Sequence, residues 1–296
     1  MSLNGWLNVD KPAGLTSYGV IARIKKITGR CRIGHAGTLD PLATGVLPIA
    51  LGQATRTVEY LHQLSKTYQA DIELGTATDT YDAEGRITFT ADASAVTLSQ
   101  VAAALKGFSG SIEQIPPMYS ALKLNGRPLY ELARRGETAE LKPRAVTIFR
   151  LDLLEFTSPV VRIEVECSGG TYIRSLAYDL GQALGVGAHL KKLRRTAYGC
   201  FNIGQAVALD ELTDVGGVAA ALLPLDHGLD LLPRLMLDAA MSASLSHGVV
   251  TPELRAQLAE GQAYRLYAAE GVLTAIADLT GPELRLKVFG AAQPGE

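Results

Sequence analysis

A glycine-rich polar segment at residues 34–47, GHAGTLDPLATGVL, constrains the fold of this chain more than any other stretch. The apolar run at residues 47–51 follows directly and predicts a buried strand. Glycines allow backbone conformations and close approaches that a Cβ atom would prevent. Pro41 disfavours the helical region for the residue before it, which places Asp40 on an extended turn. The segment therefore predicts a polar loop held against a buried strand.

Asp40 has two interpretations from the residues alone. An aspartate next to a proline is a common turn former. A carboxylate in a polar loop can also act as a nucleophile. The local pattern does not separate these two roles.

Alternation and capping residues predict the regular elements around this loop. Residues 66–74 alternate cleanly, which predicts a half-buried strand with Tyr68 on its apolar face. An inward tyrosine of this kind is commonly a core residue with a hydrogen-bonded hydroxyl. A capping box at residues 97–100 predicts a helix that ends near Gly107. Further strands are expected at residues 7–10, 146–156 and 160–168, and a turn at residues 82–85. Further helices are expected at residues 17–28, with Thr16 or Ser17 as N-cap, and at residues 173–184, closed by Gly185.

Arg174 lies in the first turn of the helix expected at residues 173–184, off its apolar stripe. A cation at a helix N-terminus opposes the helix dipole. Free backbone N–H groups at the same place favour anions. The position therefore predicts a carboxylate or phosphate partner for Arg174.

The formal net charge of -2 conceals an uneven distribution. Residues 1–200 carry 23 Lys and Arg against 18 Asp and Glu, whereas residues 201–296 carry 5 against 12. The basic part is the one that can contact a phosphate backbone. Its densest run is KKLRR at residues 191–195, for which a solvated strand edge and an RNA contact both stay open. Residues 115–144 carry scattered cations and several prolines, which predicts an excursion from the core.

Composition and missing motifs exclude several classes of protein. No apolar run approaches the roughly 18 residues of a membrane span, and the first residues lack the pattern of a signal peptide. Cys31, Cys167 and Cys200 form no C-x-x-C pair and are expected to be reduced, mostly buried thiols of a cytoplasmic protein. The chain has no P-loop, no G-x-S-x-G elbow and no H-E-x-x-H zinc motif.

Five segments, in order along the chain, resemble motifs of the TruB family of bacterial tRNA pseudouridine synthases. They are LNVDKP at residues 7–12, GHAGTLDPLATG at 34–45, KTY at 66–68, IPPMYSALK at 115–123 and GTYIR at 170–174. The resemblance implies an α+β pseudouridine synthase core at residues 1–230, with a central mixed, mostly antiparallel sheet flanked by helices. It also implies an RNA-closing flap at about residues 115–144 and a small β-rich, PUA-like module at residues 231–296.

The same resemblance implies a reaction and a substrate. The chain is expected to isomerise the uridine at position 55, in the T-loop of the T-arm of tRNA, to pseudouridine. Neither cofactor nor metal is expected, and neither a membrane nor an obligate protein partner. The target base is hidden while it is stacked, so it is expected to flip out of the RNA.

The family's site roles transfer to matching positions. Asp40 is expected to be the nucleophile, Arg174 its ion-pair partner, and Tyr68 the residue that stacks on uracil and takes part in proton transfer. His35 is expected to enter the RNA loop in place of extruded bases, its alternative being a turn histidine bonded to backbone, and Lys11 is expected to support the active loop. The other residues expected to bind RNA or substrate are Gly37, Thr38, Lys123, Arg134, Arg135, Tyr172, Lys191, Lys192, Arg194 and Arg195.

Two rival functions stay open. One is an RNA chaperone that folds tRNA while its chemistry is secondary. The other is a glycosidase that acts on a nucleoside, but such enzymes commonly use two carboxylates. No second carboxylate is evident beside Asp40 in the sequence.

Overall fold

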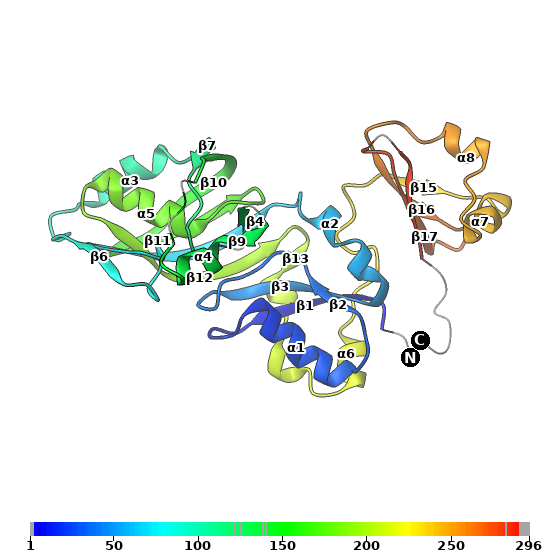
Figure 1. Cartoon of the computed structure of the whole chain (residues 1–296), viewed down its shortest axis with the longest axis horizontal. Helices are drawn as coiled ribbons and strands as arrows, with labels where there is room; N and C mark the ends of the chain where they lie inside the picture. Colours follow the sequence, from blue (N-terminus) through cyan, green and yellow to red (C-terminus); the bar gives the residue numbers. More distant parts are fainter. Residues whose placement is uncertain are drawn as a thin grey trace.

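The computed structural model describes residues 3–120, 122–124, 126–137, 139, 141–281 and 283–289. Side chains at positions 123, 124, 128, 130 and 134 lie outside that description. A large mixed sheet with helices on it forms one part of the chain, and a smaller sheet formed by residues near the C-terminus lies beyond helix α2 (Val58–Leu61) (Figure 1).

Within the described residues, ten strands form the large sheet, in the order β14-β1-β3-β12-β4-β11-β10-β7, with β13 on β12 and β2 on β3. Only the β1/β14 and β3/β12 pairs are parallel, which confirms the predicted mixed, mostly antiparallel sheet. The strands are β1 (Gly5–Lys11), β2 (Ile33–His35), β3 (Thr44–Leu51), β4 (Lys66–Leu74), β7 (Gly110–Gln114), β10 (Arg144–Thr157), β11 (Val160–Cys167), β12 (Ala188–Tyr198), β13 (Phe201–Asn202) and β14 (Val207–Ala208).

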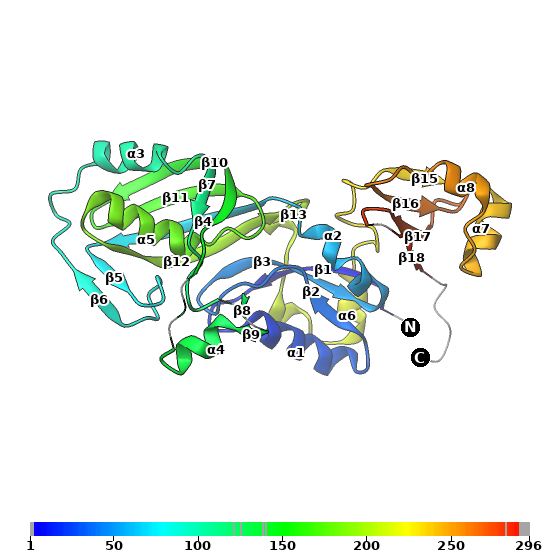
Figure 2. The same ribbon diagram turned by 45° about the horizontal axis from the view of Figure 1, so that its top comes forward.

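Helices α3 and α5 cover the half of the sheet formed by β4 and β10 to β12, while α1 and α6 cover the β1–β3 half (Figure 2). The bounds are α1 (Ser17–Thr28), α3 (Leu98–Lys106), α5 (Ile173–Leu184) and α6 (Val215–Ala220). Short connecting elements are η1 (Gly52–Arg56), η2 (Ile203–Gln205), η3 (Leu209–Glu211), and the hairpin β5 (Thr76–Thr78) and β6 (Ile87–Thr90).

The predicted helix boundaries are confirmed by their caps. The Thr16 hydroxyl accepts from the Gly19 N–H at 2.9 Å and begins α1. Thr97 and Gln100 form the reciprocal capping box of α3. Gly185 ends α5 with a φ of 73°, a conformation that glycine adopts without a Cβ penalty.

The basic run at residues 191–195 is not a solvated strand edge, which corrects one of the two interpretations left open. It belongs to β12, which lies between β3 and β4 inside the sheet. Its pairing with β3 joins residues about 150 positions apart, so the sequence pattern could not place it. Arg195 is 1% exposed and Arg194 is partly buried.

The smaller sheet, β15-β16-β17-β18, confirms the predicted β-rich module. Its elements are β15 (Arg234–Met236), α7 (Ala239–Ser246), α8 (Pro252–Ala256), β16 (Ala263–Tyr267), β17 (Leu273–Asp278) and β18 (Arg285–Val288). One apolar cluster joins the module to the larger part, because Ile276 and Phe289 pack with Trp6 and Tyr60. The Tyr60 hydroxyl also donates to Asp278 at 3.1 Å.

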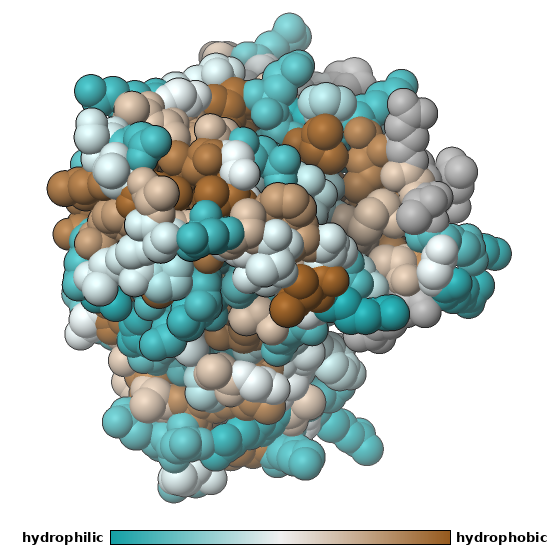
Figure 3. Space-filling view, turned by 90° about the vertical axis from the view of Figure 1, so that its left-hand side faces the viewer, coloured by the Kyte–Doolittle hydropathy of each residue, from teal (hydrophilic) through white to brown (hydrophobic). Residues whose placement is uncertain are grey.

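The segment predicted as an excursion forms β8 (Lys123–Leu124), β9 (Arg127–Pro128) and the short helix α4 (Leu129–Arg134), beside α1 in the view of Figure 2. The side chains of Lys123 and Arg134, both predicted to contact RNA, lie outside the described residues. At the end of the molecule that carries β6, apolar side chains reach the surface among polar ones (Figure 3), and Ile87 and Phe89 are exposed there.

The expectation of mostly buried thiols is wrong for one cysteine. Cys167 is buried and Cys31 is half-buried, but Cys200 is exposed and its sulfur lies 3.3 Å from His227 Nε2. Cys200 follows the end of β12, where the chain turns at the surface. Among the described helices, none has both the length and the apolar character to span a membrane.

Candidate active site

Arg174 and two carboxylates form the charged centre of the candidate site. Arg174 Nε lies 3.0 Å from Asp40 Oδ2, and Nη2 donates to Asp40 Oδ1 at 3.2 Å. Arg174 Nη1 lies 3.6 Å from Asp82 Oδ2. The Arg174 side chain is only 5% exposed, whereas that of Asp40 is 34% exposed. The carboxylate partner predicted for Arg174 is therefore present, and a second one accompanies it.

Two backbone carbonyls complete the surroundings of the Arg174 guanidinium. Nη1 donates to Thr80 O at 3.2 Å, and Nη2 also donates to Tyr119 O at 2.8 Å. A buried guanidinium needs such partners because an unpaired buried charge is strongly unfavourable. The planar fork is thus fixed from several sides, and its edge with Nε and Nη2 is directed toward Asp40.

Asp82 was predicted only as part of a turn, and the expectation that no second carboxylate accompanies Asp40 is wrong. The Asp82 carboxylate accepts from the Thr80 hydroxyl at 2.6 Å and from the Glu84 N–H at 3.1 Å. Its side chain is 6% exposed. The turn lies between β5 and β6, and contacts with distant residues of β12 and α5 bring it to the site, so local sequence gave no signal of this role.

Burial raises the pKa of Asp40 above the ordinary aspartate value, and the charge of Arg174 opposes that shift. The neighbouring charge of Asp82 raises the pKa further, and Lys11 lowers it. A carboxylate that is partly desolvated is less stabilised by water than one on the surface. Asp40 is therefore a more basic carboxylate than an exposed aspartate.

Helix α1 and strand β1 hold the loop that carries Asp40. The Ser17 hydroxyl accepts from Leu39 N–H at 2.8 Å and lies 3.2 Å from Leu39 O. Lys11 Nζ donates to Leu15 O at 2.5 Å, to Pro12 O at 2.9 Å and to Pro41 O at 3.2 Å. Lys11 is fully buried, and this desolvation lowers its pKa to about 8. Its three acceptors place it beneath the loop, in the supporting position that was predicted.

Two glycines of the loop are required by close packing against β12. Gly37 has a φ of 84°, and a Cβ there would lie 2.9 Å from Tyr198 Cε2. Gly45 has a φ of 99°, and its Cβ would lie 2.2 Å from Arg195 O. Arg195 in turn donates from Nε to Val46 O at 2.7 Å and from Nη2 to Gly37 O at 3.1 Å. Arg195, which was predicted to contact RNA, has its guanidinium bound to the backbone of this loop and also lines the cavity described below.

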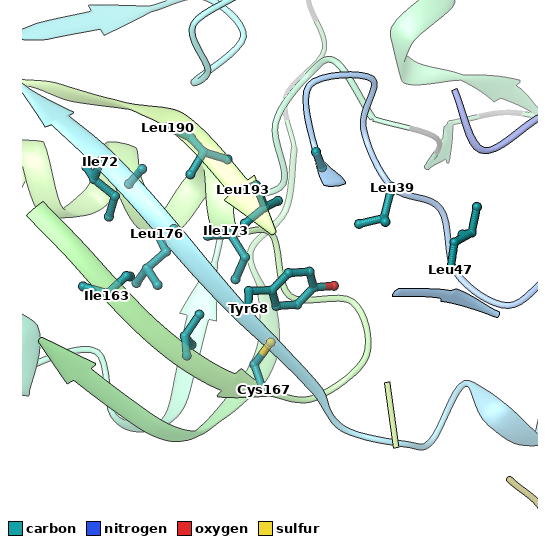
Figure 4. Close-up of a cluster of buried hydrophobic side chains, with 14 of the residues drawn as sticks. Leu39, Leu47, Tyr68, Ile72, Ile163, Cys167, Ile173, Leu176, Leu190 and Leu193 are labelled. Atoms are coloured by element: carbon teal, nitrogen blue, oxygen red, sulfur yellow. The ribbon is translucent and has the colours of Figure 1, made fainter. Parts of the chain in front are cut away.

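Tyr68 lies at the border between the apolar core and the cavity. It is 8% exposed and packs in the core cluster, with its hydroxyl directed toward the loop that carries Leu39 (Figure 4). Burial raises the pKa of the Tyr68 hydroxyl, and the nearby Arg195 opposes this rise. The core role predicted from the alternation and the cavity role implied by the family resemblance thus coincide in one side chain.

The first turn of α5 is tied to the end of β7. Gln114 binds both backbone groups of Tyr172, accepting from its N–H at 2.8 Å and donating to its carbonyl at 2.9 Å. The Ser175 hydroxyl donates to Ile115 O at 2.7 Å. These bonds fix the backbone on both sides of Arg174 and so fix the position of its side chain relative to Asp40.

A cavity of about 850 Å³ opens over these residues. Of the predicted site residues, it is lined by Gly37, Thr38, Asp40, Tyr68, Tyr172, Arg174 and Arg195. Lining residues that the sequence did not single out for a site role include His62, Gln63, Lys66, Asp82, Tyr119, Ser120 and Tyr198. A cavity of this size can enclose a flipped nucleotide.

Some predicted RNA-binding residues lie outside this lining. His35 ends β2, and its Nδ1 is buried with no hydrogen-bond partner among the described residues. Lys191 pairs with Glu73 at 2.9 Å and Arg194 with Asp10 at 2.8 Å. Lys192 and Arg135 are exposed. No group of three or more His, Cys, Asp or Glu side chains in the described residues has the arrangement of a metal site.

Lys66 is a buried cation on the wall of the cavity. Its Nζ donates to Leu64 O at 2.6 Å and His62 O at 3.1 Å, and it lies 4.4 Å from the centre of the Tyr198 ring. Burial lowers the pKa of Lys66 to about 8. The KTY motif drew attention to Tyr68, but Lys66 shares its strand and faces the same cavity.

Comparisons with known proteins relate the chain to one family. Residues 25–173 match the family model of the TruB family pseudouridylate synthase N-terminal domain, and residues 174–230 match the tRNA pseudouridylate synthase B C-terminal domain. A tRNA pseudouridine synthase B of Dehalococcoides mccartyi strain CBDB1 is 47% identical, over 93% of this chain and 92% of that protein. The tRNA pseudouridine synthase B of Burkholderia mallei is 45% identical, over 98% of this chain and 99% of its own length.

Solved structures share the fold as well. A chain of a Cbf5-Nop10-Gar1 complex superposes with a TM-score of 0.72 at 28% identity, covering 97% of this chain and 84% of that one. A chain of an H/ACA RNP bound to a substrate RNA containing 2'-deoxyuridine gives 0.70 at 26% identity, covering 98% and 85%. The chain belongs to the TruB family of tRNA pseudouridine synthases.

Proposed function

We propose that this chain converts one uridine of the tRNA T-loop, at position 55, to pseudouridine, with Asp40 as the nucleophile and no cofactor. The observation that supports this most directly is the Asp40–Arg174 pair at the wall of a cavity that Tyr68 also lines. Relatives at 45% to 47% identity that bear the name tRNA pseudouridine synthase B support the tRNA substrate.

The reaction breaks the bond between ribose C1′ and uracil N1, turns the base and joins C1′ to C5. The hydrogen on C5 leaves as a proton and N1 gains one, so atoms and electrons balance without an oxidant or reductant. Asp40 adds to the substrate, at C6 of the base or at C1′ of the ribose, and departs after the base has turned. A partly desolvated carboxylate held by Arg174 suits both addition and departure.

Arg174 and Asp82 prepare Asp40 for this task. Arg174 fixes the orientation of the Asp40 carboxylate with two contacts and favours its charged form. Asp82 holds the other side of the same guanidinium, which keeps Arg174 from turning away when Asp40 becomes an ester. Both carboxylates contact the same guanidinium and line the same cavity, so product analysis has to separate this reaction from that of a glycosidase with paired acids.

Tyr68 stacks on the flipped uracil in this proposal and serves the proton transfer that follows rejoining. Tyr68→Phe keeps the ring and removes the hydroxyl. We expect stacking and tRNA affinity to persist, and turnover to fall by about 10²-fold if the hydroxyl moves the proton. Full turnover by Tyr68→Phe in a single-turnover assay would remove the proton-transfer role and leave the stacking role intact.

An unmodified tRNA transcript tests the whole proposal. Wild-type protein is expected to form pseudouridine at one T-loop uridine, and Asp40→Asn at none, when products are mapped to the nucleotide. Asp92→Asn is the matched control, because Asp92 is an exposed aspartate that bonds only locally to Ser94. Modification by Asp40→Asn at the wild-type rate would rule out Asp40 as the nucleophile.

The same reaction mixtures separate the rival functions. Free uracil released from RNA would indicate a glycosidase. Binding of the transcript by wild-type and Asp40→Asn protein without any pseudouridine would indicate a chaperone. Rescue of tRNA folding by Asp40→Asn equal to wild type would assign the biological role to binding.

A further inference from the structure

Tyr81 has a backbone conformation that is unusual for its residue type. Its φ is 65°, and no other non-glycine residue in the described part of the chain has a positive φ. The left-handed region is unfavourable for a tyrosine because Cβ approaches the following carbonyl. Such conformations persist only where the surrounding structure fixes them, and they cluster at functional sites.

The backbone of the turn around Tyr81 forms hydrogen bonds within the turn and to strand β12. Tyr81 N–H donates to Thr78 O at 3.3 Å, and Leu190 N–H of β12 donates to Tyr81 O at 3.0 Å. Ala83 N–H donates to Leu190 O at 3.0 Å. A Cβ on Gly85 would lie 2.3 Å from the Thr80 hydroxyl, so the turn admits no larger residue there. The strained residue thus has a rigid frame on its backbone side.

Both neighbours of Tyr81 bind Arg174. Thr80 O accepts from Nη1 at 3.2 Å, and Asp82 Oδ2 lies 3.6 Å from the same atom. Because Tyr81 has a left-handed backbone conformation, the Thr80 carbonyl before it and the Asp82 carboxylate after it both point to the Arg174 guanidinium. Thr80 and Asp82 line the cavity, whereas Tyr81 does not.

The Tyr81 ring stacks on Tyr178 of α5, with ring centres 4.1 Å apart and planes at 21°. Tyr178 follows Arg174 by four residues on the same helix, and residues four apart share one helix face. The turn therefore meets α5 at two points, through the Arg174 guanidinium and through the Tyr178 ring. The carboxyl group of Asp179, the next residue of α5, also lies near Tyr81, and burial raises the pKa of Asp179 to about 6.

We infer that the Tyr81–Tyr178 stack is a positioning device for the reaction: it clamps the strained turn to α5 and so keeps Asp82 and Thr80 on Arg174. The inference rests on the proposed roles of Asp40 and Arg174. Neither tyrosine lines the cavity, so both act through Arg174 and the orientation that it gives to Asp40. Small displacements of a positioned group can cost large factors in rate.

Paired substitutions test the stack. Tyr178→Leu and Tyr81→Asn remove one ring each, and asparagine tolerates the left-handed region, so the backbone of the turn keeps its conformation. We expect kcat to fall about five- to tenfold with KM for tRNA unchanged, since a stacked pair accounts for an effect of that order. Tyr178→Phe and Tyr81→Phe keep the stack and are expected to retain wild-type kcat.

The pH profile separates positioning from general loss of stability. The charged groups around Asp40 are Arg174, Asp82 and Lys11. A looser Arg174 would lower the pKa of Asp40 less, so the acid limb of kcat is expected to move up by roughly half a pH unit in Tyr178→Leu. Leu184→Ala, at the far end of α5, is expected to lower the melting temperature and leave this midpoint in place. An equal shift of the midpoint in Leu184→Ala would overturn the inference, as would wild-type kcat and midpoint in both ring-less variants.

Amide hydrogen exchange measures how firmly the turn is held on α5, independently of catalytic activity. The amides of Tyr81 and Ala83 are expected to exchange at least tenfold faster in Tyr178→Leu than in Tyr178→Phe or wild type. Unchanged exchange would overturn the clamp, whatever the activity of the wild-type protein. Wild-type protein that makes no pseudouridine, or an active Asp40→Asn, would instead contradict the proposed function, so the two failures are distinguishable.

Discussion

Lys11→Met tests how a buried cation stabilises the active loop. Lys11 donates to three carbonyls, one of them Pro41 O next to Asp40. Methionine fills a similar volume but donates nothing, so the three acceptors lose their partner. At about 1–3 kcal/mol for each buried acceptor, the gross loss is roughly 6 kcal/mol.

Removal of the buried charge returns part of that loss. Burial lowers the pKa of Lys11 from 10.5 to about 8, which corresponds to about 3 kcal/mol of preference for the neutral form. The net expectation is a decrease of about 3 kcal/mol in the free energy of unfolding at pH 7. Trp6, the single tryptophan, is fully buried on the same strand and reports urea unfolding by fluorescence. Lys192→Met, at an exposed position, is the control and is expected to change stability little.

The pH dependence of this difference has a definite sign. Between pH 8 and 10.5 the unfolded chain holds the Lys11 proton more tightly than the folded protein does, so wild-type stability gains from rising pH. The methionine variant lacks this gain, and the difference between the two proteins should therefore widen by up to about 3 kcal/mol across that window. A decrease under about 1 kcal/mol at pH 7, or a difference that narrows above pH 8, would refute the assignment of Lys11 as a charged brace.

Further expectations concern the loop, the nucleophile and the thiols. Gly45→Ala should cost at least about 3 kcal/mol in thermal unfolding, because its Cβ would lie 2.2 Å from Arg195 O at a φ of 99°; a loss below about 1 kcal/mol would mean that the loop can shift away from β12. The acid limb of kcat should have its midpoint above the ordinary aspartate value of 3.8, because burial raises the pKa of Asp40 and only the ionised form adds to the substrate; a midpoint at or below 3.8 would contradict that environment. Iodoacetamide should modify the exposed Cys200 first and spare the buried Cys167 in the native protein, as peptide mass spectrometry can show; equal labelling would mean that the core opens readily.

Elements that depend on local chemistry could be predicted from the sequence. The capping box at Thr97, the cap at Thr16 and the terminal Gly185 each involve neighbours within a few residues, and all three are present in the structure. The alternation at residues 66–74 likewise placed Tyr68 on an inward face. The resemblance to a family then added the pairing of Asp40 with Arg174, which are 134 residues apart.

The position of β12 and the burial of Arg195 depend on strand pairing between distant residues, which the sequence pattern did not reveal. The KKLRR run has the composition of a solvated edge, yet β12 lies inside the sheet because it pairs with both β3 and β4. A buried strand accommodates Arg195 because its guanidinium reaches Val46 O and Gly37 O. Those acceptors exist only once the loop has packed on β12, so no local pattern could distinguish Arg195 from its exposed neighbour Lys192.

The turn at Asp82 shows the same limit in the candidate site. The residues around it, DTYDAEG, read as an ordinary turn, and in the structure they do form one. What makes the turn functional is the side of it that meets α5, and this depends on the left-handed Tyr81 and its stacking on Tyr178. A tyrosine gives no signal of that conformation, since asparagine and glycine are the residues that usually adopt it. The part of the site that orients Arg174 was therefore hidden, because its chemistry depends on a backbone conformation that only the tertiary contact stabilises.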